Sequence, residues 1–137
     1  MNGLWPMNFY IAGHALIAKD GNYLVTRRSS YNDYMPLKWD IPGGIVQDGE
    51  TLEDAIVREV KEETQLTIEI GHVICIYANR DQLPKRQDFQ AIYLCRYSAG
   101  DVQLNMSEHD AYEWLSYDEI KSLDTIDFLR YLLKSYS

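Results

Sequence analysis

Three glutamates crowd one turn of a predicted helix. Glu59, Glu62 and Glu63 are three and four residues apart, a spacing that makes side chains neighbours on a helix. Like charges so placed cost an isolated helix about 0.2 to 0.5 kcal/mol per pair, and the macrodipole also disfavours acids in a last turn. We therefore expect an exposed strip of carboxylates that binds a hard divalent cation, Mg²⁺ or Mn²⁺. A solvated acidic face is the alternative.

A loop with one proline and three glycines, residues 42–49, precedes this helix. Clustered carboxylates beside such a loop suit metal-assisted chemistry on phosphates, because Mg²⁺ commonly shares its coordination shell among carboxylates, water and phosphate oxygens. Arg58 can reach Glu50 or Glu62, and we interpret it as a residue that orients carboxylates. Loop and helix are predicted to form one site.

The helix is indicated by its first residue and by its periodicity. Thr51 is a suitable N-cap, and Asp54 follows at the third position of the helix. Apolar residues then recur at helical spacing, at Leu52, Ala55, Ile56 and Val60. One face is thus predicted to pack in the core, and the acids lie on another face.

Residues 44–66 resemble the Nudix box, the G-x5-E-x7-R-E-U-x-E-E-x-G-U signature of Nudix hydrolases, in which U is a bulky apolar residue. The matching positions are Gly44, Glu50, Arg58, Glu59, Val60, Glu62, Glu63 and Leu66. The preceding residues 39–44 are similar to the W-x-x-P-G-G segment of many family members. Gln65 stands where the family usually has Gly. That Gly commonly ends the helix in left-handed geometry, so Gln65 puts the helix end in question but removes no ligand.

The resemblance implies a metal-dependent hydrolase of nucleoside diphosphate-linked compounds, in which water attacks a phosphorus of the diphosphate. It assigns metal binding to Glu59, Glu62, Glu63 and the Gly44 carbonyl, and catalysis to Glu59, Glu63 and Glu108, with the general base either Glu59 or Glu108. A nucleoside triphosphate, a nucleotide sugar and a dinucleoside polyphosphate all stay open as substrates. The alternatives are a Nudix-fold nucleotide-binding or regulatory module without turnover, which would be expected to lose box acids, and an acidic protein-interaction domain.

Other polar and aromatic residues are candidates for substrate contacts. Arg27 and Arg28 come at the end of a strand-like segment and are our candidates for binding a phosphate, with surface solubility as the alternative. His109 and Asp110 are expected to be polar loop residues. Four aromatic residues could stack on a base, but packing is the favoured interpretation for Tyr31, Tyr34, Trp39 and Tyr77.

The remaining elements are predicted from alternating or helical patterns. Strands are expected at residues 10–18, 23–27, 67–78, 89–97 and 111–115, with a polar loop at 79–88. Helix starts are indicated by Ser116 with Glu119 and by Asp124 with Asp127. The resemblance implies an α/β fold, a Nudix-type α/β/α sandwich with a mixed β-sheet, and the coarse pattern allows it. Residues 1–137 are predicted to form a single domain.

Composition narrows the partners and the compartment. The net charge of −8 argues against a nucleic-acid polymer, because proteins that bind one normally present a basic face; a small phosphorylated nucleotide arriving with metal fits better. The first seven residues lack a positive n-region and no apolar stretch is long enough for a membrane span, so we expect a cytoplasmic protein without membrane contact. Cys75 and Cys95 are expected to be buried inert thiols. A homodimer is left open.

Overall fold

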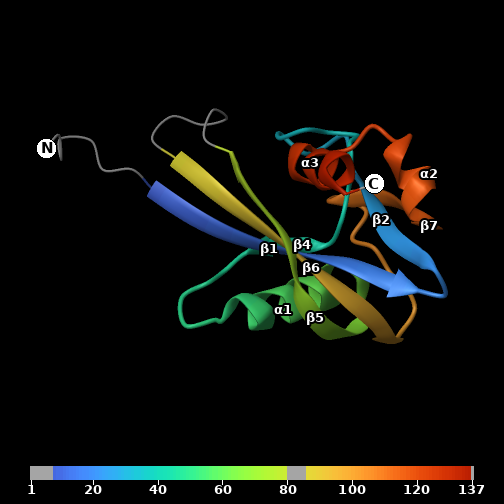
Figure 1. Ribbon diagram of the computed structural model, residues 1–137, viewed down its shortest axis with the longest axis horizontal. Helices are drawn as coiled ribbons and strands as arrows, with labels where there is room; N and C mark the ends of the chain where they lie inside the picture. Colours follow the sequence, from blue (N-terminus) through green and yellow to red (C-terminus); the bar gives the residue numbers. More distant parts are fainter. Residues whose placement is uncertain (1–7, 80–85, 137) are drawn as a thin grey trace, which may run out of the picture.

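The structure, a computed structural model, describes residues 8–79 and 86–136. Its centre is one mixed β-sheet in the order β3-β2-β1-β6-β5, with β4 also paired to β1 and β7 also paired to β2 (Figure 1). The central strands β1 and β6 run parallel, and the other pairs of named strands are antiparallel. The strands are β1 (Asn8–Lys19), β2 (Asn22–Arg28), β3 (Trp39–Asp40), β4 (Gly43–Ile45), β5 (Thr67–Asn79), β6 (Arg86–Ala99) and β7 (His109–Leu115).

Helices cover both faces of this sheet, as Figure 1 shows, with α1 (Leu52–Thr64) on one side and α2 (Tyr117–Lys121) and α3 (Asp127–Ser135) on the other. Successive strand residues face opposite sides, so neighbours in β1 enter different cores. Leu16 packs with α2 and α3, whereas Ile17 packs with α1. The predicted α/β/α sandwich with a mixed sheet is confirmed.

Local residues set where α1 begins and ends and how closely it packs on the sheet. Thr51 Oγ1 accepts a hydrogen bond from the Asp54 backbone N–H at 3.1 Å, so the predicted N-cap is confirmed. At the other end Gln65 adopts φ 66°, the left-handed geometry that usually falls to Gly, and its N–H donates to the Lys61 carbonyl. Gly13 lets the helix approach β1 closely, since a Cβ there would lie 2.6 Å from Ile56.

All five predicted strands are present, and the structure adds two that the sequence patterns did not indicate. The short strands β3 and β4, of two and three residues, lie around the glycine-rich loop and are too short to show an alternating pattern. β5 and β6 extend beyond their predicted ends into the segment 79–88 that was expected to be a loop; residues 80–85 lie outside the described part of the chain. The two cysteines are buried and free, as expected.

The two predicted helix starts fared differently. Ser116 and Glu119 form a complete capping box at the start of α2, which confirms that prediction. The second start was wrong in its first residue, because α3 begins after Ile126, which makes no side-chain cap. Asp124 instead accepts from Lys38 Nζ at 2.7 Å. Burial of Phe128, Leu129, Leu132 and Leu133 therefore holds this short helix without a polar cap.

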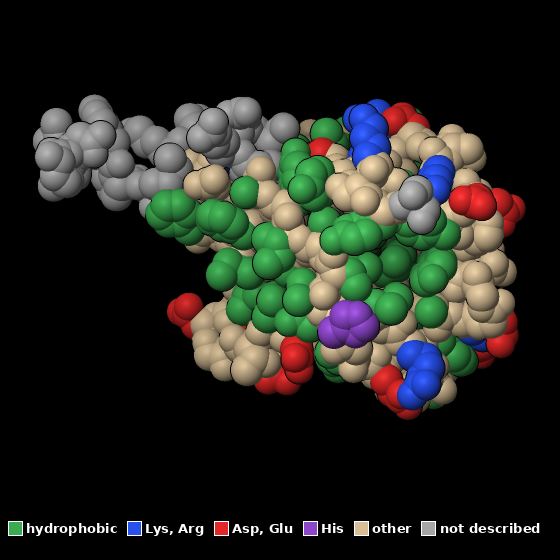
Figure 2. All heavy atoms as spheres, in the orientation of Figure 1, with side chains coloured by type: hydrophobic (Ala, Val, Ile, Leu, Met, Phe, Trp, Pro, Cys, Tyr) green, Lys and Arg blue, Asp and Glu red, His purple; other side chains and the backbone are tan. Residues whose placement is uncertain are grey.

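The surface is mixed in character. Figure 2 shows a broad hydrophobic area on the viewed side, with acidic side chains mostly toward its rim. The edge strand β5 contributes exposed apolar side chains, with Val73 44% and Ile76 64% exposed. Within residues 8–79 and 86–136, no helix has the length and apolar character needed to cross a membrane.

Candidate functional site

The glycine-rich loop and α1 meet at two close contacts. A Cβ on Gly44 would lie 2.5 Å from the carboxyl carbon of Glu59, so only glycine lets this carboxylate lie against the loop backbone. One residue earlier, the Gly43 N–H donates to Glu63 Oε2 at 2.9 Å. Pairing of β4 with β1, in which Gly44 lies opposite Gly13, holds the loop in place. Loop and helix therefore form one site.

Arg58 ties three box carboxylates together. It donates to both oxygens of Glu50, from Nε at 2.6 Å and from Nη2 at 2.9 Å. Its Nη1 donates to Glu59 at 2.8 Å and to Glu62 at 3.2 Å. These bonds lower the pKa of Glu50 to about 2, chiefly through the Arg58 hydrogen bond, and raise the pKa of Arg58. The predicted reach of Arg58 to Glu50 and Glu62 is confirmed.

The prediction of an exposed strip was wrong for one of its three glutamates. Glu62 is exposed, but Glu63 is only 8% exposed and lies under the loop, with Oε1 3.8 Å from His109 Nε2. Burial is the main reason that the pKa of Glu63 is raised well above its ordinary value, and repulsion from Asp40 and Glu59 adds to it; the Gly43 N–H acts in the opposite direction. The three acids are neighbours, but α1 turns Glu63 toward the sheet.

The carboxylates suit a hard divalent cation in chemistry, although they do not yet stand in a coordination arrangement. Within the described residues, no three His, Cys, Asp or Glu side chains converge as metal ligands. The hydrogen bonds explain this, because Arg58 holds Glu59 and Glu62, and Gly43 holds Glu63. The mutual repulsion that raises the pKa of Glu63 is what a bound cation would relieve, and the donor set is all oxygen.

A cleft of about 230 Å³ opens beside this junction and contains one of the two predicted phosphate-binding arginines. Arg28 lines it and donates to the Tyr34 carbonyl at 2.9 Å and to Asp40 at 3.4 Å. Arg27 is not among the lining residues; its Nε donates to Asp110 at 2.8 Å. The lining residues are Tyr10, Ala12, His14, Arg28, Tyr34, Asp40, Gly43, Gly44, Ile45, Glu63, Arg86, Asp88, Gln90, Ile126 and Phe128.

The segment that was expected to be a late polar loop lies close to the buried glutamate. Glu108 is exposed in the turn before β7 and near enough to Glu63 for its charge to help raise the pKa of Glu63. The loop expectation was wrong for His109 and Asp110, which begin β7. His109 is buried, and burial is the main reason that its pKa is lowered.

The aromatic candidates divide between cleft and packing. Tyr34 lines the cleft, and its hydroxyl donates to Asp127 at 3.0 Å. Tyr77 packs on Tyr131, with ring centroids 5.2 Å apart, and Trp39 lies 6.0 Å from the Arg27 guanidinium. Tyr31 is 82% exposed. Packing is thus confirmed for Tyr34, Trp39 and Tyr77, which lie against the core that α3 covers, and is wrong for Tyr31. Tyr34 also reaches the cleft.

Sequence reasoning missed the far wall of the cleft, which β1 and β6 build from alternate residues. His14 comes from β1, and Arg86, Asp88 and Gln90 come from β6. Two of these residues fell in the segment predicted to be a loop. The signal that was present is the alternation of polar residues at 86, 88 and 90, which places them on one face of a strand.

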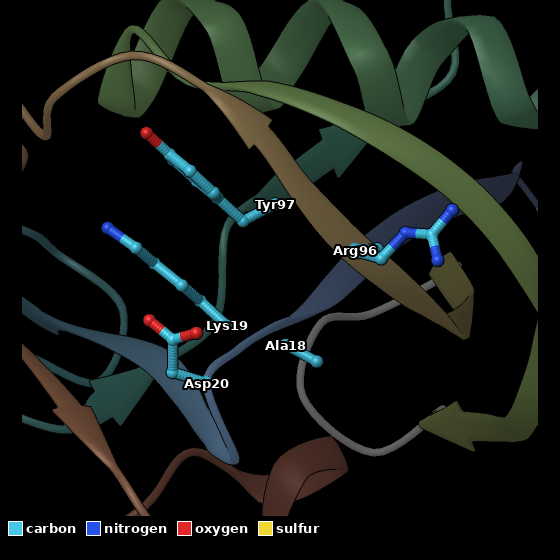
Figure 3. A pocket seen from close by; sticks show the side chains of 5 residues that line it. All are labelled: Ala18, Lys19, Asp20, Arg96 and Tyr97. Carbon is cyan, nitrogen blue, oxygen red and sulfur yellow. The ribbon is translucent and has the colours of Figure 1, made fainter.

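A second hollow lies at the other end of β1, at its turn into β2. Figure 3 shows Lys19 and Tyr97 projecting to one side of it and Arg96 to another. Lys19 Nζ lies 4.2 Å from the Tyr97 ring centroid, and Arg96 forms an ion pair with Glu69. Both cations already have partners, and none of the predicted site residues lines this hollow.

Comparison with known proteins identifies the family of the chain. The family model of the NUDIX domain matches residues 7–136, and the chain belongs to the Nudix hydrolase family. A MutT-like protein of Streptomyces ambofaciens is 30% identical over 115 residues, covering 84% of this chain and 68% of that protein. An ADP-ribose pyrophosphatase of Methanocaldococcus jannaschii is 30% identical over 95 residues, covering 68% of this chain and 54% of that protein.

Solved structures give the same result for the fold. The crystal structure of a MutT protein from Methanosarcina mazei Go1 has a TM-score of 0.81 and 30% identity, covering 94% of this chain and 93% of that one. The chain spans about half the length of the archaeal pyrophosphatase but nearly the whole of this MutT protein. The protein is therefore an enzyme of the Nudix hydrolase class.

Proposed function

We propose that this protein is a divalent-metal-dependent pyrophosphohydrolase that cleaves the diphosphate of a nucleoside diphosphate derivative, with water attacking one phosphorus. The observation that carries the proposal is the junction at which Arg58 gathers Glu50, Glu59 and Glu62 while Gly43 and the buried Glu63 meet beside the cleft. Clustered acids repel one another, and a bound divalent cation would offset that repulsion.

Within this proposal each group has a separate task. Glu59, Glu62, Glu63 and the Gly44 carbonyl would hold Mg²⁺ or Mn²⁺, which when bound would neutralise charge on the diphosphate and acidify water. Arg28 on the cleft wall would contact a phosphate oxygen.

Arg27, the second arginine predicted to bind a phosphate, is less well positioned to do so. Arg27 would have to leave Asp110, to which its Nε donates at 2.8 Å, before it could reach a substrate. We therefore propose Arg28 as the main phosphate-binding arginine and Arg27 as an accessory one.

We assign the general base to Glu108 ahead of Glu59. Glu59 is held by Arg58 at 2.8 Å, and Glu63 accepts from the Gly43 N–H. The Glu108 side chain is exposed and has no hydrogen bond within the described residues, so an attacking water can use it. Glu108 would then accept a proton from that water.

The experiment is a hydrolysis screen with Mg²⁺ and with Mn²⁺ across nucleoside triphosphates, nucleotide sugars including ADP-ribose, and dinucleoside polyphosphates. Reaction in ¹⁸O-water should place the label on one phosphate product. Glu59→Gln should lower turnover strongly, though less than Glu63→Gln, and Glu53→Gln, an exposed acid in the first turn of the same helix, is the matched control. A protein whose melting midpoint rises with metal and nucleotide, but which hydrolyses none of them, would be a binding module instead.

A further inference from the structure

One face of β6 changes from apolar to polar toward the beginning of the strand. Ile92 and Leu94 pack in the core that α3 covers. At the preceding alternate positions, Gln90, Asp88 and Arg86 line the cleft beside the Nudix box. Arg86 and Asp88 are paired with each other, since Arg86 Nε donates to Asp88 Oδ1 at 2.7 Å, so Gln90 is the buried member of this run whose polar atoms have still to be matched.

Gln90 is held in one orientation by a buried histidine. Both residues are buried, Gln90 at 9% and His14 at 6% exposure, and His14 Nε2 lies 2.7 Å from Gln90 Oε1. The imidazole is in turn stacked on Phe128, with ring centroids 4.0 Å apart and an angle of 26° between the planes. The amide of Gln90 therefore has little freedom to rotate.

The direction of this hydrogen bond follows from the other ring nitrogen. Gln90 Oε1 can only accept, so in this arrangement His14 Nε2 carries the proton and Nδ1 is an acceptor. With the amide reversed, the proton would move to His14 Nδ1, which has no partner within the described residues. A buried N–H without an acceptor is rarer and more costly than an under-satisfied acceptor, so the first arrangement holds.

This leaves the amide nitrogen of Gln90 as an unused donor on the cleft wall. Gln90 Nε2 forms no hydrogen bond with the described residues, and it is not one of their fully enclosed unpaired polar atoms, which are His14 Nδ1 and Thr26 Oγ1. It is therefore accessible from the cleft that Gln90 lines. Its two hydrogens require an acceptor on whatever binds there.

We propose that Gln90 is a specificity-determining residue that donates from its amide nitrogen to a ring carbonyl oxygen of the substrate's base, and that His14 is the positioning residue that fixes this orientation. This inference rests on the proposed function, because it assigns the base end of the same nucleotide. The cleft, at about 230 Å³, is below the roughly 300 to 1,000 Å³ of pockets that enclose a whole drug-sized ligand, so it would take only part of a nucleotide. Arg28 and Glu63, assigned to the diphosphate, line the same cleft as Gln90, so the base would lie against the β6 wall.

The chemistry predicts a choice between two classes of base. Guanine and uracil present a carbonyl oxygen where adenine and cytosine present an amino group. An amino group facing Gln90 Nε2 would bring donor against donor and leave both unpaired, which costs a factor of about 10 or more in rate. Guanine, through its O6, and uracil, through its O4, should therefore be preferred.

The test compares kcat/KM for GTP with ATP and for UTP with CTP, under the same metal concentration. If another substrate class is hydrolysed, the same bases are compared within it. We expect the carbonyl bases to be preferred about 10-fold or more, Gln90→Leu to bring both ratios near one, and Gln90→Glu, which accepts but does not donate, to favour the amino bases. Gln87→Leu is the matched control, since Gln87 lies on the opposite face of β6, and it should keep the wild-type ratios.

A second set of measurements separates positioning from folding. His14→Leu should lower the ratios toward those of Gln90→Leu, and the double variant should match Gln90→Leu alone, because His14 acts through Gln90. A general loss of stability would lower all four rates together and leave the ratios intact.

The outcomes distinguish this inference from the function on which it rests. Turnover with equal rates for carbonyl and amino bases would overturn the role of Gln90 and leave the hydrolase assignment intact. If no substrate class were hydrolysed, the hydrolase assignment would fail. Gln90 would then be tested through the melting midpoint of the wild-type protein with the α,β-methylene analogues of GTP and ATP: a larger rise with the GTP analogue supports its role, and equal rises refute it.

Discussion

The helices on the two faces of the sheet bury similar apolar stripes but carry different second faces. Ile56 and Val60 of α1 are fully buried, as are Leu129 and Leu132 of α3. The outer face of α1 bears Arg58, Glu59 and Glu62, while Glu63 turns inward. In contrast, α3 contributes to the cleft only through Phe128 in its first turn. Helix α1 therefore carries both core residues and site residues along its length, whereas α3 serves almost entirely in core packing.

The apolar packing of α1 explains how the chain tolerates a repulsive cluster of acids. The apolar stripe of α1 holds the helix against β1, with Gly13 permitting close approach, so the acids need not stabilise it. Substitutions on the outer face of α1 should therefore act mainly on turnover, and substitutions inside α3 mainly on stability.

The largest effect should come from Glu63→Gln. Gln preserves the volume and can still accept from the Gly43 N–H, but it removes a proposed ligand charge. We expect turnover to fall about 1,000-fold, roughly 4 kcal/mol in activation free energy, measured on a substrate found in the screen. Retention of wild-type turnover in this variant and in Glu59→Gln and Glu62→Gln would show that the box acids are not catalytic here.

The same variant should be more stable than wild type at neutral pH. Because the folded state raises the pKa of Glu63, that carboxyl favours folding below its ordinary pKa of 4.5, and this contribution is lost as pH rises through the folded-state value. Gln has no such charge, so the stability gain should be present at pH 7 and vanish near pH 4. Urea unfolding at both pH values measures it.

Leu129→Ala should have the opposite effect, with a large loss of stability and little change in turnover. Leu129 is fully buried against the sheet, and such truncations cost about 2 to 5 kcal/mol. Unfolding in urea gives the loss, and kcat should be unchanged at a temperature at which the variant is folded. A fall in kcat comparable to that of Glu63→Gln would mean that the α3 core and the chemistry are coupled.

Arg58→Ala should lower both the stability and the turnover, each to an intermediate degree. It releases Glu50, Glu59 and Glu62 at once, and loss of such an orienting residue typically costs 10- to 100-fold in metal affinity or activity. Thermal melting and metal titration of turnover provide the readouts. Arg58→Lys keeps the charge without the two-pronged contact, so it should recover only part of the rate.

The Arg58 network also has a predicted pH signature. The pKa of Glu50 is lowered to about 2, so its contribution to stability is present above pH 4.5 and is lost as pH falls toward 2. In Arg58→Ala most of this acid-sensitive part should be missing, and the Gln47 N–H, which donates to Glu50 at 2.9 Å, keeps the remainder. Identical acid unfolding profiles for wild type and variant would show that the Arg58 network does not stabilise the fold.

The smallest effect should come from Gln65→Gly. Gln65 ends α1 with φ 66°, its side chain is exposed, and glycine adopts this geometry without the penalty of about 1 kcal/mol that other residues incur. The variant should gain up to about 1 kcal/mol in unfolding free energy. Gln65→Ala removes the same side chain but keeps the penalty, so a gain in that variant as well would assign the effect to the side chain and not to φ.

Much of the architecture was predictable because it depends on neighbours in the chain. Thr51 caps α1, the apolar stripe at 52, 55, 56 and 60 sets its buried face, and alternation marks the long strands. The reach of Arg58 to Glu62 follows from helical spacing as well, whereas its contact with Glu50 depends on how the loop enters the helix. Even the left-handed end at Gln65 agrees with the box position, although no glycine is there.

From the sequence alone, the family, the box helix, five of the seven described strands and the set of acids could therefore be predicted. Only the tertiary structure decided which acid is buried, since Glu63 lies under Gly43, twenty residues away, and which arginine lines the cleft, since Arg28 and Arg27 project differently from one strand. It also paired His14 with Gln90 across 76 residues. The physical reason is that local spacing sets which side chains are neighbours on an element, while the packing of distant elements sets which of them are enclosed and what they meet.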